Sequence, residues 1–177
     1  MWRRALIRGD YEELYLVGHS LGGLVVRRAL CDAADQWIDL GRQVQKPAIL
    51  YATVRLFSPA SAGFRAAGIL GMIKASGVWA AVEIFVRRSS AYTDLQPKST
   101  TVNDTRRRTE RLAAVPGCEA LRAWIVWANP DDVVIPERYD SDHVGDSWDG
   151  TTHSTVCKPR RTTFEAPWRF VESGETR

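Results

Sequence analysis

The sequence contains few of the residues that cross-link small proteins or bind metal ions. Among its 177 residues there are three cysteines and three histidines. The cysteines are odd in number and widely separated, so they indicate no disulfide framework, and no Cys/His spacing is typical of a zinc site. We expect each thiol to act as a small buried apolar group in a reducing compartment, and therefore predict a cytoplasmic protein without a metal site. The three are Cys31, Cys118 and Cys157.

A strong excess of either charge is also missing. The chain has 24 Lys and Arg against 21 Asp and Glu, a formal net charge of +3. This small excess argues against a dedicated nucleic-acid surface. The one basic run, Arg106 to Arg108, is interpreted as the solvated face of a helix rather than a phosphate site.

No long apolar run is free of charge. The first residues, "MWRRALIRG", lack the apolar core and the small-residue cleavage site of a signal peptide. Residues 66–86 are long enough to cross a bilayer. Lys74 would lie near their middle, however, where a charge costs about 2.5–3.5 kcal/mol. Several glycines further weaken a single helix, so we interpret this segment as one or two apolar helices that cover another part of the molecule.

Three stretches of the chain have the composition of buried strands. They are residues 14–17, residues 48–57 and residues 120–128, each apolar and bordered by Gly or Pro. Helical patterns separate them, so the order strand, helix, strand, helix, strand predicts a parallel sheet. We therefore predict one α/β domain over residues 1–177.

Helices are predicted from the spacing of apolar residues and from capping residues. Apolar positions recur at helical spacing from Val26 to Trp37, with charged residues between them. A shorter helix, capped by Asn103 or Asp104, is expected to reach Ala114. Residues 129–159 are expected to be loop-rich. The last stretch, "TFEAPWRFVES", has helical spacing that a proline interrupts.

The stretch "LYLVGHSLGGLVV" contains the pattern Gly-x-Ser-x-Gly, with Ser20 at its centre. It joins a predicted buried strand to a predicted helix. That is the setting of a nucleophile elbow, in which a tight turn lifts the hydroxyl above the sheet and the helix N-terminus points at a developing oxyanion. Gly18 and Gly22 meet the need of such a turn for very small residues. We therefore favour a nucleophilic Ser20 over a plain strand-to-helix turn.

A serine hydroxyl needs a base to take its proton, and the chain has only three histidines. His19 adjoins the serine, and we expect it to be structural within the turn or to border the substrate. His143 and His153 both lie in the late loop, so both are candidate bases. Residue types alone do not decide between them.

The acid that orients the base is expected just after a buried strand. Asp131 and Asp132 follow the predicted strand of residues 120–128 in "WIVWANPDDVVIP". An ordinary acidic turn after a strand explains the pair equally well.

Three motifs resemble the serine esterase and lipase branch of the α/β-hydrolase superfamily. "GHSLGG" (18–23) resembles its nucleophile elbow, and "DDVVIP" (131–136) resembles its acid loop. "THSTVCKP" (152–159) resembles the histidine loop of intracellular lipase-like relatives near the GPI inositol-deacylases. The motifs stand in family order and span nearly the whole chain. The resemblance implies a partial α/β-hydrolase fold, with a helical cap or lid inserted at residues 60–98.

By position in these motifs, the resemblance implies that Ser20 is the nucleophile, Asp131 the acid and His153 the base. Asp132 is the alternative acid, because the pair leaves the register open. His143 is the alternative base.

The family places several strands before its elbow, whereas only residues 1–13 precede the elbow strand here. One loop of those early strands supplies an oxyanion-hole donor, and the amide of Leu21 would supply the other. We therefore expect a fragment of the fold, with a sheet of three or four strands and one bare edge. The missing N-terminal half or a second copy would be its partner there.

The predicted reaction is hydrolysis of carboxylic esters, of small molecules or lipids, through an acyl-enzyme, and it calls for no metal or organic cofactor. Apolar residues of the cap would line an acyl-chain pocket or simply pack on the core, and the region 64–86 is a candidate for peripheral membrane contact. Two alternatives stay open: an inactive remnant that acts in protein or membrane association, and an acyltransferase. The apolar cap residues are Ile69, Leu70, Met72, Ile73, Trp79, Ile84 and Phe85.

Overall fold

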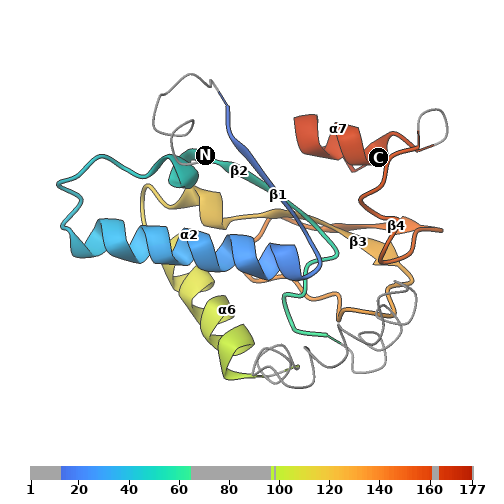
Figure 1. The fold of residues 1–177 in the computed structure, drawn as a ribbon, viewed down its shortest axis with the longest axis horizontal. Helices are drawn as coiled ribbons and strands as arrows, with labels where there is room; N and C mark the ends of the chain where they lie inside the picture. The colour runs from blue at the N-terminus through green and yellow to red at the C-terminus, as the bar shows by residue number, and fades with distance from the viewer. Residues whose placement is uncertain (1–12, 65–96, 98, 161–163, 177) are drawn as a thin grey trace, which may run out of the picture.

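The computed structural model describes residues 13–64, 97, 99–160 and 164–176. Figure 1 shows the course of the chain through these elements. In chain order they are β1 (Tyr15–His19), α2 (Leu21–Asp39), the 3-10 helix η1 (Ala48–Tyr51), β2 (Thr53–Phe57), α6 (Thr100–Ala113), the 3-10 helix η2 (Glu119–Leu121), β3 (Trp124–Asn129), β4 (Asp146–Asp149) and α7 (Ala166–Ser173).

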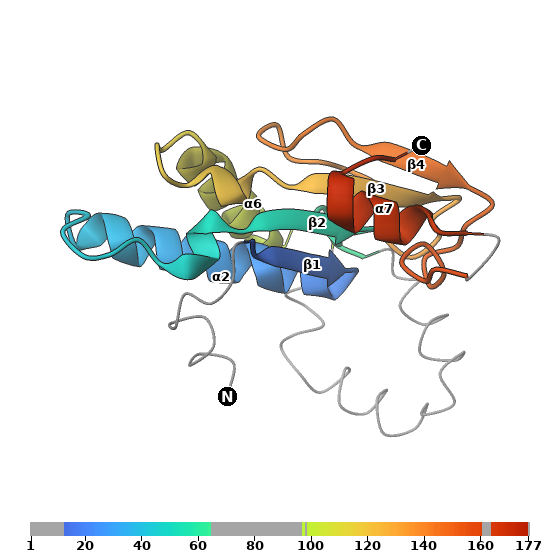
Figure 2. The ribbon, with the colours of Figure 1, turned by 90° about the horizontal axis from the view of Figure 1, so that it is seen from above.

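The four strands form one sheet in the order β1-β2-β3-β4, and every neighbouring pair is parallel. Gly18 of β1 lies beside Leu56 of β2, and Leu56 lies beside Ile125 of β3. Helices flank the sheet, so the predicted α/β class is confirmed. Because the strands are parallel, their carboxyl ends meet at one edge of the sheet, as the arrowheads in Figure 2 show. Ligand and catalytic sites of α/β sheets lie at that edge.

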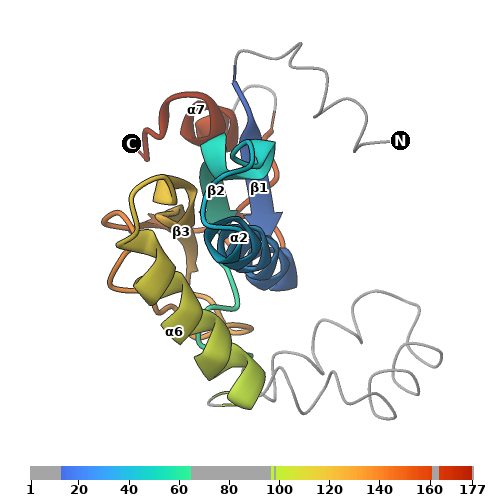
Figure 3. The same cartoon turned by 90° about the vertical axis from the view of Figure 1, so that its left-hand side faces the viewer.

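Alternate side chains of the strands point to opposite faces of the sheet, and each face packs against its own apolar cluster. Helices α2 and α6 cover one face, and α7 covers the other (Figures 1 and 3). On β2, Val54 and Leu56 join the cluster under α2 and α6, whereas Phe57 joins the cluster under α7. This period of two is what a strand covered on both sides requires. The larger cluster also includes Leu30, Cys31, Ala34, Leu112, Ile125 and Trp127, and the smaller one includes Val126, Ala128, Trp148 and Phe170.

Strand β1 is an edge strand among the described residues, since only β2 pairs with it there. The sequence predicts that this strand is buried on both faces, and this is wrong: Val17 is 49% exposed. Two apolar side chains of α2, Leu21 and Val25, are exposed as well. Within the described residues, the bare sheet edge expected from the sequence is therefore found at β1.

Two of the predicted strands begin with a 3-10 helix instead. Residues 48–51 form η1 and β2 starts at Thr53, while η2 precedes β3. The structure also contains β4, which the sequence does not predict, because only Trp148 of its four residues is buried. A strand of four mostly exposed residues contains no apolar run from which it could be predicted.

The helix ends also differ from the predicted ones. Ser99 caps α6, and its Oγ accepts the amide N–H of Val102 at 3.3 Å. Asn103 and Asp104 lie inside this helix, so neither is the cap. Pro167 does not interrupt α7, because it lies in the first turn, where a missing N–H breaks no helical bond.

Most of the predicted cap, including Ile69, Met72 and Trp79, lies outside the described residues, as does the apolar segment 66–86. No helix in the described part of the chain is long and apolar enough to cross a membrane. The three cysteines carry free thiols; Cys31 and Cys118 are buried and Cys157 is half-buried.

Candidate active site

Ser20 lies on the turn between the end of β1 and the start of α2. Its backbone has a φ of 56°, a left-handed conformation that costs a residue with a side chain free energy. The turn is tight because a Cβ on Gly18 would lie 2.9 Å from the Cα of Gly23, and one on Gly23 would lie 2.7 Å from Pro59. The motif predicts Gly22 as the second crowded position, and this is wrong: a Cβ there meets nothing within 4 Å.

The hydroxyl of Ser20 is directed away from its own helix. Ser20 is the N-cap of α2, yet its side chain makes no capping bond. Its Oγ lies 2.9 Å from Nε2 of His153 instead. A serine at an N-cap ordinarily satisfies one of the first helical amides. The local structure thus gives up a stabilising cap in favour of a contact with an imidazole 133 positions away.

His153 connects Ser20 to a carboxylate. The imidazole is buried, and its Nδ1 lies 3.0 Å from Oδ2 and 3.1 Å from Oδ1 of Asp131. Because an ionised carboxylate only accepts hydrogen bonds, Nδ1 carries the proton. In the neutral form of this imidazole, Nε2 is then unprotonated and accepts the hydroxyl proton of Ser20. This is the tautomer that a general base for a serine needs.

Asp131 is held by several donors. The amides of Val133 and Val134 donate to its Oδ1 at 3.0 and 3.1 Å. Burial by itself raises the pKa of Asp131, but hydrogen bonds from His153, Val134 and Ser58 outweigh it, so the pKa lies below its ordinary value. The carboxyl is therefore ionised at neutral pH and stabilises a positive charge on the imidazole.

Ser58 also belongs to the site, although no sequence motif predicts it. It directly follows β2, is fully buried, and has a positive φ of 39°. Its Oγ accepts the amide N–H of Ala128 at 2.9 Å, which leaves its one proton for the carboxylate of Asp131. A polar residue immediately after a buried strand, the pattern that identifies Asp131, is also the signal that marks Ser58.

The loop that carries His153 follows β4. The Oγ1 of Thr151 donates to the carbonyl of Trp148 at 2.7 Å, and the amide of Val156 donates to the carbonyl of Thr152 at 3.0 Å. Val156 is buried in the cluster under α7. The loop is therefore a packed turn with its own hydrogen bonds.

The structure does not bring the alternative acid and base into the site. Asp132 is exposed and has no hydrogen bond to His153 among the described contacts. His143 stacks on Trp124, with ring centroids 4.0 Å apart, at the beginning of β3. That is the opposite end of the strand from Asp131. The structure thus brings Asp131 and His153 together with Ser20 and does not bring Asp132 or His143 to them.

The remaining predicted site residues have different surroundings. His19 is half-buried, and its Nε2 lies 2.7 Å from the carbonyl oxygen of His153. Leu21 is the first residue of α2, so its amide has no carbonyl partner within the helix and is available to an anion. Within the described residues, no group of three or more His, Cys, Asp or Glu side chains is placed to hold a metal ion.

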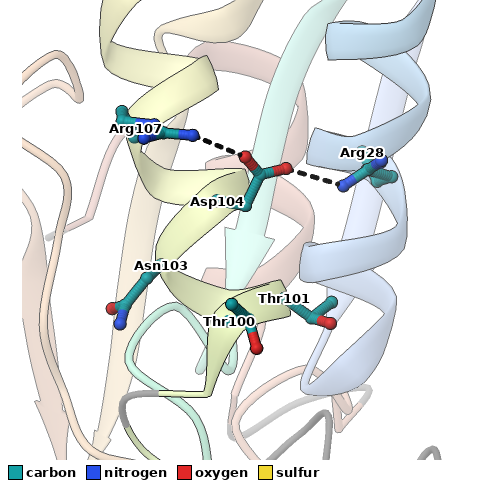
Figure 4. Close-up of a pocket in the computed structure, with 6 residues that line it drawn as sticks. All are labelled: Arg28, Thr100, Thr101, Asn103, Asp104 and Arg107. Carbon is teal, nitrogen blue, oxygen red and sulfur yellow. Dashed lines mark hydrogen bonds and ion pairs between the residues drawn. The ribbon is translucent and has the colours of Figure 1, made fainter.

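The arginine run on α6 is paired with carboxylates. Figure 4 shows Asp104 between Arg107 and Arg28. Its carboxylate lies 3.1 Å from a guanidinium nitrogen of each, and these residues line a hollow of about 440 Å³. Arg108 is bound to Asp32 and to a second carboxylate of α2, and Arg106 is bound to glutamates. Arg107 is exposed, as expected for a solvated helix face, whereas the side chain of Arg108 is only 16% exposed.

Comparison with known proteins gives one similar structure. No protein-family model matches the chain, and no curated protein matches it. The crystal structure of Bacillus licheniformis lipase BlEst2 in mature form is similar, with a TM-score of 0.46 and 16% sequence identity over 88% of this chain. The chain spans 64% of that lipase. None of these findings concerns the GPI inositol-deacylases.

Stability is expected to fall as the pH is lowered from about 6.5. Burial lowers the pKa of His19 and His143 below the ordinary value of 6.5. The unfolded chain therefore binds protons at these positions first, and acid favours unfolding. Urea unfolding at pH 7.5, 6.0 and 5.0 measures this. His143→Gln is expected to reduce the dependence of the free energy of unfolding on pH. A free energy of unfolding that rises on acidification would contradict the lowered pKa of these histidines.

Proposed function

We propose that this protein hydrolyses carboxylic esters with Ser20 as its nucleophile. The observation that supports the proposal best is the continuous chain of short contacts from Ser20 Oγ through His153 to Asp131. Positions 20, 131 and 153 are far apart in the sequence, and their side chains meet at the carboxyl edge of a parallel sheet. A serine, a base and an acid in this arrangement are the parts required for acyl transfer.

The reaction proceeds in two steps. His153 Nε2 takes the proton of Ser20 as Oγ forms a bond to the ester carbonyl carbon. The imidazolium then gives that proton to the alkoxy oxygen as the carbon–oxygen bond breaks, which leaves an acyl-serine and a free alcohol. In the second step a water molecule gives a proton to His153 and attacks the acyl group. The proton returns to Ser20 as the acid leaves.

Two features of this chain stabilise charge in that sequence. The carboxylate of Asp131 stabilises the imidazolium of His153 through the Nδ1 proton. The amide of Leu21, at the positive end of the helix dipole of α2, is the donor proposed for the developing oxyanion. A single oxyanion donor in place of two costs about 10²–10³ in turnover, so we expect slow catalysis if Leu21 acts alone.

The proposed substrates are small-molecule or lipid esters. Leu21 is an exposed apolar side chain next to Ser20 and suits an acyl group. Ile69, Met72 and Trp79 are proposed as further residues of the acyl-chain pocket. We propose that water accepts the acyl group from Ser20. An acyltransferase would pass that group to another molecule instead.

A series of p-nitrophenyl esters with acyl chains of two to ten carbons tests the proposal. Wild-type protein is expected to release p-nitrophenol, and Ser20→Ala is expected to reduce the rate at least about 10⁴-fold. Ser154→Ala is the matched control, because this exposed serine belongs to the same loop as the base and its hydroxyl, among the described hydrogen bonds, is paired with Thr152. Equal rates for wild type and Ser20→Ala would contradict the proposal.

A further inference from the structure

His19 makes a contact that the proposed chemistry does not use. Its Nε2 lies 2.7 Å from the backbone carbonyl oxygen of His153, in a part-buried contact. A carbonyl only accepts, so Nε2 of His19 carries the proton and donates. The two imidazoles also lie against each other, with ring centroids 4.8 Å apart at 42°. The residue before the nucleophile thus binds the backbone of the base.

This contact closes a ring between the elbow and the histidine loop. One link is the hydrogen bond between the Ser20 hydroxyl and Nε2 of His153. The other is the hydrogen bond from His19 to the carbonyl of His153. His19 and Ser20 are adjacent in the backbone, and the backbone of His19 is fixed beside Phe57 in the sheet. Together with the hydrogen bonds between Nδ1 and Asp131, these two links set the position of the imidazole relative to Oγ.

Asp131 and Ser20 hold the imidazole of His153, whereas His19 holds its backbone carbonyl. Nδ1 of His153 is bound to Asp131, and the loop's other hydrogen bonds through Thr151, Thr152 and Thr155 join it to itself or to β4. Only His19 and Ser20, at the end of β1, hold it from the elbow side among the described hydrogen bonds. A shift of about 1 Å in a reacting group can cost on the order of 10²-fold in rate.

We propose that His19 is a positioning residue, whose imidazole holds the carbonyl of His153 and thereby keeps the base against Ser20. This inference rests on the proposed function of Ser20. It assigns His19 a role toward the base rather than toward the substrate.

The charge state of His19 fits this role. Burial lowers the pKa of His19 and outweighs the hydrogen bond to the backbone of His153, which raises it. The charges of the His153 side chain and Lys158 also lower this pKa, whereas the charge of Asp131 raises it. His19 is therefore neutral near pH 7. A neutral donor holds the carbonyl without repelling the imidazolium that forms on His153 during catalysis.

Two substitutions of His19 separate positioning from simple packing. Leu fills a similar space but cannot donate, whereas the amide nitrogen of Gln occupies nearly the place of Nε2 and keeps a donor. We measure the maximal rate and the apparent affinity of labelling by a fluorophosphonate probe. His19→Leu is expected to lower the maximal rate roughly tenfold with unchanged affinity, the loss of about one hydrogen bond. His19→Gln is expected to stay within about threefold of wild type.

The same substitutions of His143 are the control, because this histidine stacks on Trp124 at the other end of the sheet. His143→Leu and His143→Gln are expected to label at the wild-type rate. Amide hydrogen exchange of residues 153–158 gives a second readout, since it should quicken in His19→Leu and not in His19→Gln. Because the exchange is compared between the Leu and Gln variants, it reports on this loop even where a variant is less stable overall.

Each outcome points to a different conclusion. Equal labelling and equal exchange in His19→Leu and wild type, or equal losses in the Leu and Gln variants, would overturn the positioning role alone. A folded wild-type protein that the probe does not label would overturn the proposed function, and the positioning role with it.

Discussion

Replacing His153 with alanine is expected to slow ester hydrolysis by about 10⁴- to 10⁶-fold. Its Nε2 is the atom in contact with the Ser20 hydroxyl at 2.9 Å, and no other imidazole nitrogen contacts that hydroxyl among the described hydrogen bonds. Without the base, the hydroxyl keeps its proton and is a poor nucleophile at neutral pH. The p-nitrophenyl ester assay measures the loss.

The matched control is His143→Ala. Both histidines lie in the stretch between β3 and α7, but His143 stacks on Trp124 at the beginning of β3 and lies at the wrong end of that strand. It is expected to keep nearly the full rate. A large loss in His143→Ala together with a small loss in His153→Ala would reverse the assignment of the base.

Replacing Asp142 with alanine is expected to lower the free energy of unfolding by about 3–5 kcal/mol. Its carboxylate lies 2.7 Å from the guanidinium of Arg27, and both side chains are almost wholly buried. The same carboxylate accepts the amides of Ala123 and Tyr139. Its removal leaves a buried positive charge against the ring of Tyr139 without a counter-ion. Within the described part of the chain, two further nitrogens of Arg27 already have no hydrogen-bond partner.

Urea unfolding monitored by tryptophan fluorescence checks this value. Asp32→Ala is the control, because Asp32 forms ion pairs with arginines at the surface, where an exposed pair contributes about 0–1 kcal/mol. Replacing the buried pair together, as Arg27→Met with Asp142→Leu, should recover much of the loss because no charge stays unpaired. A change below about 1 kcal/mol in Asp142→Ala would show that the pair is not isolated from water.

The sequence predicts the parallel sheet and the position of Ser20 because both depend on local patterns. Gly18 to Gly22 lie between an apolar strand and an amphipathic helix, and the pattern needs no distant contact to be recognised. The short strand β4 has no such pattern, since one buried tryptophan among polar residues is also typical of a loop. Without β4, the place where the histidine loop begins is not predictable.

The choice between the two late histidines and between the two aspartates depends on tertiary structure. His143 precedes β4 and His153 follows it, so the parallel pairing of β4 with β3 sends them to opposite ends of the sheet. Asp131 and Asp132 differ by one position, and only the folded turn directs the first toward the imidazole. The motif resemblance favours the residues that the structure brings together, but residue types alone leave each pair open.

Contacts between strands also explain what the sequence analysis misses. The hydroxyl of Ser58 meets the amide of Ala128 because β2 and β3 are neighbours. The crowding at Gly23 arises from Pro59, which follows β2. Residues 36 or more positions apart in the chain make these contacts, and neither spacing nor composition records them.

Mapping the adduct of a fluorophosphonate probe by mass spectrometry tests the activated serine most directly. Such probes form a stable bond only with a serine whose proton a neighbouring base removes. We predict one adduct on the folded protein, on the peptide that contains Ser20, and none after Ser20→Ala or after unfolding in urea. A folded protein that carries no adduct, or carries it on another serine, would contradict the account.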